Sequence, residues 1–499
     1  MPTSTPGSAP APDPPASAAP EPHPLATLAV IVALGAAVRI GCALLKATVA
    51  TDAYYYVKIA KLMLAGDWDR ALTHGYHPLY PALTALFSFF FGDVAMAGHA
   101  VSILLGALSA IPAWFIGKRL GGPRTAIFAA LLVAVHPDSV DVGSDILVEA
   151  TFSFFFLYGI ACTLRAVSLL DFRAAALAGL AGGLAYLTRP EGLALPALAA
   201  VAILAAGLPR FRPTATPDGA RRACAAALAV CVFLACFIPY AVRIREHLGR
   251  WAITGKSGGA AFDINAKPGT GEGQKAVTEK GAQNPLYRPW YFIRKFSMTI
   301  YLGFLPLLLA AAFVSVPRAP DNRLARLALL GLLFIYLPPL IRLLYAKGYV
   351  STRHLLLPSL VVVLLLAPVA AALSEKWKRG LAVLVLLIAA VALPKSLRPA
   401  RRNQLPLKEA GIWLRATAPG AELMGPEKTA LYAGVHLWHL PESRQSGAIE
   451  AEMRAARLKW LVLLESDEPG VAAGLDGRFQ LVKQYGEGED RVTVFRLTD

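Results

Sequence analysis

The chain has 499 residues, of which 56% are hydrophobic and 16% are charged, and its mean hydropathy is +0.51. Soluble domains have about 45–50% apolar and about 25% charged residues, so this composition excludes an ordinary soluble protein and predicts a mainly α-helical, polytopic membrane protein. The formal charge of +16 does not indicate a nucleic-acid partner, because the basic residues mostly lie in short segments between apolar runs. The five cysteines lie in or beside apolar runs without a CxxC pair, and we interpret them as small apolar residues.

The N-terminal segment, 1–23, is rich in Pro, Ala and Ser, a composition that cannot form a packed core. It also lacks the basic n-region of a cleaved signal peptide. We therefore expect a disordered cytoplasmic tail, followed by a first apolar run that is retained as a membrane anchor.

Eleven segments are apolar over about 20 residues, or somewhat fewer where neighbouring helices shield the ends, which is the length that crosses a bilayer. In chain order, these predicted spans are 25–45, 94–116, 124–136, 146–164, 174–188, 192–208, 223–242, 297–316, 325–345, 354–373 and 380–394. We therefore expect a bundle of about eleven transmembrane helices within residues 24–396.

The charges of the connecting loops test this count. Five loops carry two to four Lys or Arg each, and each separates an even-numbered span from the next odd-numbered span. These loops are Gly117–Arg124, Arg165–Arg173, Pro209–Arg222, Pro317–Arg326 and Ser374–Gly380. By the positive-inside rule the basic loops are cytoplasmic. The acidic loop 137–145, the long loop 243–296, the segment 346–353 and the C-terminus then face the periplasm or the exterior.

The first outer loop, 51–92, is polar and rich in tyrosine. Its segment TDAYYYVKIAKLML predicts a helix that begins at Ala53, after Asp52. The apolar segment 79–91 (LYPALTALFSFFF) is short for a crossing, and counting it as a span would scatter the basic loops across both faces. We expect interfacial helices in this loop, with 79–91 lying at the outer leaflet as an amphipathic or re-entrant segment.

After Arg402 the sequence has the character of a soluble domain. LPLKEAGIWLRAT has apolar residues at helical spacing, KWLVLLES is typical of a buried strand, and FQLVKQYGEGEDRVTVFRL predicts two strands around a turn. Residues 405–499 are therefore predicted to form a small α/β domain on the outer face.

Polar residues near the outer ends of the predicted spans come from several spans and loops, so one shared cavity can collect them. Charges at membrane depth are costly and mark either function or paired structure. The residues are Asp52, Lys58, Lys61, His74, His77, Asp138, Asp141, Asp145, Glu149, Arg189, Glu191, Arg353 and His354.

Two carboxylates in this set have both structural and catalytic interpretations. Asp52 fits the N-cap of the helix that begins at Ala53, and a helix N-terminus also keeps a carboxylate ionised, as a general base requires. Glu149 lies one turn inside the fourth predicted span, where an ion pair with Arg189 and a catalytic role are both open. Asp145 precedes Glu149 by four residues, falls on the same predicted helix face and competes for either role.

The basic residues leave similar alternatives. Arg353 and His354 open the tenth predicted span, and an arginine there either reaches lipid headgroups or binds a phosphate. Arg189 raises the same choice. His77 and His74 are weak evidence for a metal site, so we interpret His77 as a hydrogen-bond donor in a cavity wall.

Three further motifs carry little weight. GKSGG at 255–259 lacks the strand and the first glycine of a phosphate loop. The DWD at Asp67–Asp69 is interpreted as a solvated turn, which favours a metal-independent reaction. The polar segment 255–285 is either an acceptor gate or a disordered loop.

Several stretches together resemble the GT-C superfamily of integral-membrane glycosyltransferases, in the branch of protein O-mannosyltransferases and lipid A aminoarabinose transferases. They are TDAYYY, YHPLYPAL, HPDSVDVGSDILVEATFSFFF, GLAYLTRPEGLALP and STRHLLLP, followed by the small outer domain. The resemblance covers the chain from about residue 25 onward. The WWDYG motif of oligosaccharyltransferases is absent, which argues against transfer of whole oligosaccharides to asparagine.

The resemblance implies that a hexose or pentose moves, with inversion, from an undecaprenyl- or dolichyl-type phosphate donor to an acceptor on the periplasmic or exoplasmic face. The acceptor would be a protein, lipid A, another glycan or a lipid, with no cofactor and no metal. Asp52 is then the general base, and Glu149 orients the acceptor or the sugar. The implied donor-phosphate residues are Arg353, Arg189, His354, His77 and Lys58, and the implied sugar or acceptor contacts are Tyr54, Tyr55, Tyr80 and Asp145.

The resemblance also implies a bacterial inner-membrane location and a prenyl tail held against the segment 79–91. A transporter or flippase of a lipid-linked sugar is the alternative, since it too needs charged residues at depth and a lipid groove. It would not need a carboxylate at an outer cavity or an outer domain, and the sequence shows no inverted repeat.

Overall fold

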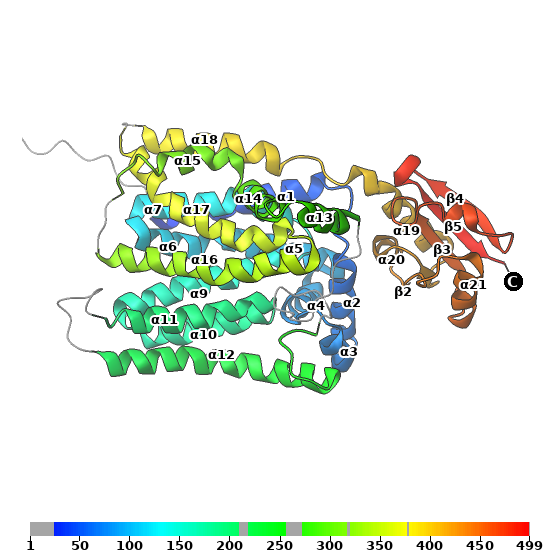
Figure 1. The fold of residues 1–499 in the computed structure, drawn as a ribbon, viewed down its shortest axis with the longest axis horizontal. Coiled ribbons are helices and arrows are strands. Elements are labelled where there is room, and N and C mark those ends of the chain that lie inside the picture. Colours follow the sequence, from blue (N-terminus) through cyan, green and yellow to red (C-terminus); the bar gives the residue numbers. More distant parts are fainter. Residues whose placement is uncertain (1–23, 209–217, 256–271, 317–319, 377–378, 499) are drawn as a thin grey trace, which may run out of the picture.

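The computed structural model describes residues 24–208, 218–255, 272–316, 320–376 and 379–498. The predicted tail 1–23 lies outside these ranges, as do nearly all of GKSGG and most of the first half of the polar segment 255–285. Figure 1 shows long helices running side by side, with a separate domain beyond one end of the bundle.

Most of the described chain is helical. In the membrane domain the helices are α1 (Pro24–Leu45), α2 (Ala53–Leu64), α3 (Trp68–Thr73), α4 (Leu79–Phe91), α5 (Val94–Leu108), α6 (Ala110–Gly121), α7 (Pro123–Val135), α8 (Pro137–Gly143), α9 (Glu149–Leu169), α10 (Phe172–Tyr186), η1 (Pro190–Leu193), α11 (Ala194–Ala205), α12 (Gly219–Leu248), α13 (Glu272–Gln283), α14 (Tyr287–Ile300), η2 (Leu302–Phe304), α15 (Leu305–Ala310), α16 (Pro320–Lys347), α17 (Thr352–Ser374) and α18 (Gly380–Ser396).

The helical membrane architecture predicted from composition is confirmed. Within the described ranges, six helices are long and apolar enough to cross a membrane, and two bent helix pairs raise this number to eight. The shorter apolar helices α10, η1–α11 and α18 coincide with the fifth, sixth and eleventh predicted spans. The total of eleven spans stays a prediction.

The start of the fourth predicted span is wrong. The loop predicted at 137–145 contains α8, and the following helix begins at Glu149 rather than one turn earlier. Pro137 restarts the chain as a helix, and the ring of His136 accepts the backbone N–H of Ser139 at 3.3 Å. The carboxylate of Asp145 accepts the next backbone N–H at 2.8 Å, which holds this stretch in a turn, so Asp145 and Glu149 do not share a helix face.

Two other predicted spans differ in shape. The eighth, 297–316, is a bent pair, α14 and η2–α15, at 72° to each other. The bend follows Tyr301, whose φ of 75° is incompatible with a continuing helix. The seventh extends to 30 residues as α12, which is longer than the hydrocarbon thickness requires.

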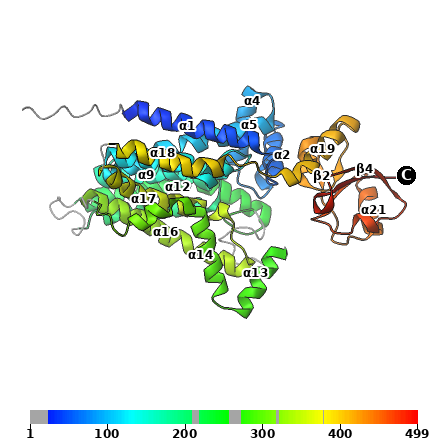
Figure 2. The same cartoon turned by 90° about the horizontal axis from the view of Figure 1, so that it is seen from above.

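The segment 79–91 forms a single helix, α4, with the predicted bounds. Figure 2 shows α4 crossing the direction of α1, and Figure 1 shows α2 lying across the end of the bundle. The side chains of Phe89 and Phe90 on α4 are 76% and 79% exposed from the protein, as expected for a helix with an apolar face toward lipid. Its position at the outer leaflet stays a prediction.

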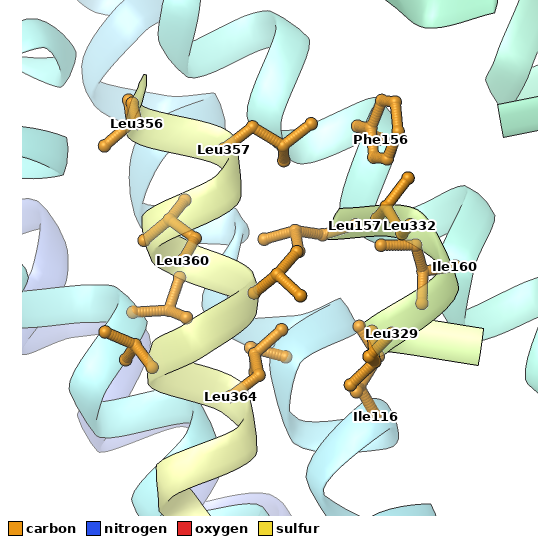
Figure 3. Packing of buried hydrophobic residues seen from close by; sticks show 14 of the residues in the cluster. Ile116, Phe156, Leu157, Ile160, Leu329, Leu332, Leu356, Leu357, Leu360 and Leu364 are labelled. Atoms are coloured by element: carbon orange, nitrogen blue, oxygen red, sulfur yellow. The ribbon is translucent and has the colours of Figure 1, made fainter. Parts of the chain in front are cut away.

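Helix α17 lies inside the bundle, and most of its side chains are buried. Figure 3 shows Leu357, Leu360 and Leu364 of α17 packing with Leu157 and Ile160 of α9. Leucines at a spacing of three and four residues place one face of α17 against its neighbours. This packing fixes the position of Arg353, which lies in the first turn of the same helix.

The C-terminal domain matches its predicted α/β character. Its elements are η3 (Arg402–Gln404), α19 (Leu405–Thr417), β1 (Leu423–Met424), α20 (Glu427–Ala433), β2 (Leu437–Trp438), α21 (Ser446–Ala455), β3 (Trp460–Leu464), η4 (Ala472–Gly474), β4 (Phe479–Tyr485), η5 (Gly488–Asp490) and β5 (Val492–Leu497). The five strands form one mixed sheet in the order β2-β1-β3-β5-β4. The helix at 405–417 and the antiparallel pair β4–β5 are confirmed.

Specific contacts attach this domain to the end of the bundle. Arg401 pairs with the fully buried Asp145, and the hydroxyl of Tyr54 on α2 accepts the backbone N–H of Leu437 at 2.9 Å. The hydroxyl of Tyr55 donates to Glu427 at 3.1 Å. The domain therefore lies against α2 (Figure 1) and contacts Asp145 of the predicted polar set through Arg401.

Candidate active site

A cavity of about 370 Å³ opens at the end of the bundle that faces the C-terminal domain. It collects residues from the starts of α2 and α17, from the segment before α4 and from the turn between α10 and η1. The lining residues are Asp52, Tyr56, Gly75, Tyr76, His77, Val148, Thr188, Arg189, Pro190, Glu191, Thr254, Tyr349, Ser351, Arg353 and His354.

Asp52 occupies the N-cap position of α2, but its side chain makes no capping hydrogen bond. Its Oδ2 lies 2.7 Å from Nη1 of Arg353, and its Oδ1 accepts the hydroxyl of Tyr76 at 3.3 Å. The capping interpretation therefore does not describe this side chain. Its carboxylate is turned toward the cavity and held by an arginine 301 positions away.

A continuous line of ion pairs joins Asp52 to Glu191. Nε of Arg353 lies 2.6 Å from Oε1 of Glu149, and Nη1 of Arg189 lies 2.7 Å from the same oxygen. Arg189 also grips Glu191 with Nη2 and Nε, at 2.9 and 3.2 Å. The ion pair between Glu149 and Arg189, one of the two interpretations, is present in the structure. It does not remove the other, because the pair borders the cavity.

This line contains three carboxylates and two guanidinium groups, and most of it is shielded from solvent. The side chains of Glu149 and Glu191 are 2% and 5% exposed, whereas those of Asp52 and Arg353 are 25% and 31% exposed. Buried charges are retained only where partners compensate them. The two ends therefore differ: Glu191–Arg189–Glu149 is a buried support, and Asp52–Arg353 is accessible to a bound molecule.

His77 forms an uncharged part of the wall. Its ring lies 5.2 Å from the ring of Tyr186 and 5.3 Å from that of Tyr240, measured between centroids. Burial lowers the pKa of His77 to about 4, so it is neutral near pH 7. Both ring nitrogens are buried, and by geometric criteria neither has a hydrogen-bond partner among the described residues.

Backbone from far along the chain closes one side of the cavity. The hydroxyl of Tyr186 donates to the carbonyl of Ile253 at 3.1 Å, which positions the neighbouring Thr254 against the cavity. A Cβ on Gly255 would lie 3.1 Å from Cα of Gly75, so the two backbones meet at van der Waals distance. A Cβ at this distance would be closer than in ordinary van der Waals contact, so the approach favours glycine at both positions.

The structure brings together six of the predicted site residues, and five lie elsewhere. Asp52, His77, Arg189, Arg353 and His354 line the cavity, and Glu149 is bonded to both arginines. The residues outside it are Lys58, Tyr54, Tyr55, Tyr80 and Asp145.

Each of these five has another position. Lys58 and Tyr54 border a groove between α2 and α20. Tyr55 stacks on Tyr76 at 5.4 Å, behind the cavity wall. The hydroxyl of Tyr80 is fully buried and donates to the carbonyl of Gly98, and Asp145 holds the C-terminal domain.

Sequence reasoning placed Glu191 in the polar set that a shared cavity can collect but gave it no individual role, and it gave none to Tyr76, Thr254 and Tyr349 of the cavity. A glutamate two residues after Arg189, next to a proline, was a readable signal for Glu191, since a charge there needs a partner. The other three are neutral residues in loops, and no local pattern marks them.

Asp67 and Asp69 of the DWD motif lie away from the cavity. Oδ1 of Asp67 accepts the backbone N–H of Arg70 at 3.2 Å and caps α3, and Asp69 pairs with Arg243. Within the described ranges, no three His, Cys, Asp or Glu side chains are grouped as a metal site would require.

The fold and site define a class of polytopic membrane protein with an ion-paired cavity at the end of the bundle that carries the C-terminal domain. Residues 73–210 match the family model described as dolichyl-phosphate-mannose-protein mannosyltransferase. No curated protein sequence matches the chain.

Solved structures of two proteins share this fold. ArnT from Cupriavidus metallidurans bound to undecaprenyl phosphate is 15% identical, with a TM-score of 0.59 over 94% of this chain and 97% of that one. The oligosaccharyltransferase of Archaeoglobus fulgidus in complex with Zn and sulfate is 12% identical, with a TM-score of 0.57 over 92% and 72%.

The archaeal oligosaccharyltransferase AglB from Archaeoglobus fulgidus, in complex with an inhibitory peptide and a dolichol-phosphate, is also 12% identical, with a TM-score of 0.55 over 94% of this chain and 74% of that one. The family-model match over residues 73–210 and the shared fold both agree with the predicted resemblance to the GT-C superfamily of membrane glycosyltransferases. The predicted resemblance is confirmed at this level.

Proposed function

We propose that the protein transfers a sugar from a polyprenyl-phosphate donor to an acceptor at the outer membrane face, with Asp52 as the general base. The observation that carries the proposal is the contact between Asp52 and Arg353 in an accessible cavity, backed by Glu149 and Arg189. A carboxylate beside an arginine supplies the two groups that the reaction needs: a proton acceptor and a cation for phosphate.

The reaction follows from these positions. The carboxylate of Asp52 takes the proton of an acceptor hydroxyl or amine as its heteroatom bonds to C1 of the sugar. The bond between C1 and the phosphate oxygen breaks, and its electron pair leaves with the polyprenyl phosphate. Attack from the face opposite the phosphate inverts the configuration. Arg353 stabilises the charge that develops on the leaving phosphate.

Arg353 has capacity for a phosphate in addition to its present partners. Guanidinium carries five N–H donors, and in the described chain those of Arg353 reach carboxylates through Nε and Nη1. A phosphate oxygen that binds Nη2, or replaces Asp52 at Nη1, would leave Asp52 to accept the acceptor's proton. Donor binding would therefore prepare the base.

The remaining parts of the cavity suit the two substrates. The neutral ring of His77 can hydrogen-bond a sugar hydroxyl or a phosphate oxygen. His354, in the first turn of α17, lies beside Arg353 and adds a second donor. The exposed aromatic face of α4, which begins two residues after His77, can hold the prenyl chain.

The test uses the purified full chain with labelled undecaprenyl- or dolichyl-phosphate sugars and a panel of acceptors. Asp52→Asn should lower the turnover number by about 10²–10⁴-fold, because it removes the proton acceptor. Asp67→Asn is the matched control: it changes a carboxylate in the same outer loop but keeps a residue that caps α3, so turnover should stay unchanged. Full turnover in Asp52→Asn would reject Asp52 as the base.

A second measurement separates the arginine's role from the base's role. Arg353→Ala should weaken donor binding more than acceptor binding, because its cation faces the leaving phosphate. If acceptor binding weakened more than donor binding, Arg189 rather than Arg353 would be the proposed phosphate ligand. Movement of the lipid-linked sugar across a bilayer without any transfer would instead favour the transporter or flippase.

A further inference from the structure

A second hollow, with a volume of about 700 Å³, lies at the end of the bundle opposite the C-terminal domain. We call it the distal groove. It is formed where α6 and α9 end and α10 begins. Its lining residues are Phe115, Lys118, Arg119, Tyr158, Ala161, Cys162, Arg165, Asp171, Arg173, Ala174 and Leu177.

The distal groove carries an excess of positive charge. Four cations line it and only one carboxylate, Asp171, does so. Nε of Arg165 lies 2.7 Å from Asp171, which also accepts the backbone N–H groups of Arg173 and Ala174 at the start of α10. Among the described residues, the side chains of Lys118, Arg119 and Arg173 have no acidic partner. The groove thus offers three uncompensated cations to an anion.

The order of residues along each helix separates charge from apolar surface. On α6, Arg119 lies nearer the bundle end than Phe115; on α10, Arg173 lies nearer the end than Leu177. The rise of a helix places each apolar side chain about 6 Å deeper than its cation. Phe115 and Leu177 lie at the surface of the protein, where 53% and 39% of their accessible area is exposed. The groove therefore has a cationic rim and an apolar wall that continues toward the middle of the membrane.

We propose that the distal groove binds a membrane phospholipid with an anionic head group. The head group pairs with Lys118, Arg119 and Arg173 at the rim, and an acyl chain lies along Phe115 and Leu177. Lys and Arg that only set the orientation of the protein in the membrane would explain the cations at this end. They would not explain a hollow with an apolar wall beneath those cations. Basic pockets between transmembrane helices are a known form of anionic-lipid site. The occupant is not the glycosyl donor, because this end lies opposite the ion-paired cavity.

The test titrates phosphatidylglycerol or phosphatidylcholine into the purified full chain in detergent and counts retained lipids by native mass spectrometry. The wild-type protein should bind phosphatidylglycerol more tightly than phosphatidylcholine. Arg119→Gln/Arg173→Gln should weaken phosphatidylglycerol binding roughly 30-fold. Each of the two arginines near the anionic head group should contribute a similar factor to the affinity, and the variant loses both factors. Arg119→Lys/Arg173→Lys keeps the charge and should retain most of the affinity, which separates a lost site from a misfolded protein.

Lys376→Gln is the matched control, because Lys376 is an exposed cation beyond the same end of the bundle but outside the groove. It should leave phosphatidylglycerol binding unchanged. Three results would each overturn the proposal. The wild type would bind both lipids equally, the double glutamine variant would keep the wild-type affinity for phosphatidylglycerol, or Lys376→Gln would lose as much affinity as that double variant. Displacement of phosphatidylglycerol by millimolar inorganic phosphate would overturn it as well, because a free anion would then be the ligand.

Discussion

Glu149 is the most constrained residue of the site. Its Oε1 accepts from both Arg353 and Arg189, while its Oε2 is buried without a partner in the described part of the chain. A buried charge network contributes little net stability when complete, yet losing one member leaves the others uncompensated. Glu149 therefore holds the side chains of Arg189 and Arg353 in their positions beside the cavity.

Replacing Glu149 tests this positioning role. Glu149→Ala should lower the free energy of unfolding by about 3–5 kcal/mol, because the largely buried Arg189 and the partly exposed Arg353 lose their shared carboxylate. Glu149→Gln keeps the shape and one acceptor oxygen and should lose less. Thermal unfolding in detergent measures both. Equal stability of the alanine variant and the wild type would contradict the network described here.

His77 gives a pH dependence with a defined sign. Its pKa in the folded chain is about 4, below the ordinary value of 6.5, because burial disfavours the charged ring. Between pH 6.5 and 4 the unfolded chain binds more protons, so the free energy of unfolding falls as the pH decreases through this window. The contribution of His77 to this fall is roughly 3 kcal/mol.

The measurement compares unfolding of the wild type and His77→Gln at several pH values from 7 to 4. The difference between the two proteins isolates His77 from the other histidines. The glutamine variant should lose less stability on acidification. Parallel curves would show that His77 does not titrate as its burial requires.

At the scale of elements, α2 connects the cavity to the C-terminal domain. Its first turn follows Asp52 directly and presents Tyr54 to the sheet and Tyr55 to Tyr76. A helix moves as a rigid unit, so the domain contact and the position of Asp52 depend on the same element. Three adjacent tyrosines therefore have three different partners: β2, the cavity wall, and, for Tyr56, the cavity itself.

This coupling predicts the effect of a single hydroxyl. Tyr54→Phe leaves the buried N–H of Leu437 without its acceptor, a loss that costs about 1–3 kcal/mol. Hydrogen exchange of the amides around β2 should become faster. Tyr485→Phe is the control, since the hydroxyl of Tyr485 has no hydrogen-bond partner among the described residues. Similar exchange in both variants would show that the Tyr54 contact does not hold the domain.

At the scale of the whole molecule, the cavity and the C-terminal domain share one end of the bundle, and the distal groove lies at the other (Figure 1). The described cations of two basic loops, Lys118 and Arg119 of one and Arg165 and Arg173 of the other, lie at the end with the groove, so the cavity end should face the periplasm or exterior. This orientation agrees with a donor whose lipid stays in the membrane while its sugar reaches an outer acceptor.

Cysteine labelling tests the orientation in intact cells. In a background with the five native cysteines replaced by alanine, Glu452→Cys on α21 should react with a membrane-impermeant thiol reagent. Lys376→Cys, at the opposite end, should be protected until the membrane is opened. The reverse pattern would invert the topology and place the site in the cytoplasm.

The sequence by itself determined the class of protein, the bounds of α4 and α19, and the polar set from which the site is built. These depend on local information: apolar length, helical spacing and charges at membrane depth. Helix breaks were harder, because Tyr301 and Asp145 stop a helix through backbone conformation and one hydrogen bond rather than through composition.

Only the tertiary structure decided what each polar side chain touches. Asp52 could have capped α2, and instead it pairs with Arg353; Asp145 looked like a site residue, and instead it holds Arg401. Both partners lie more than 250 residues away along the chain. The energy of an ion pair depends on distance and burial in space, and neither is encoded by the few residues on each side of a carboxylate.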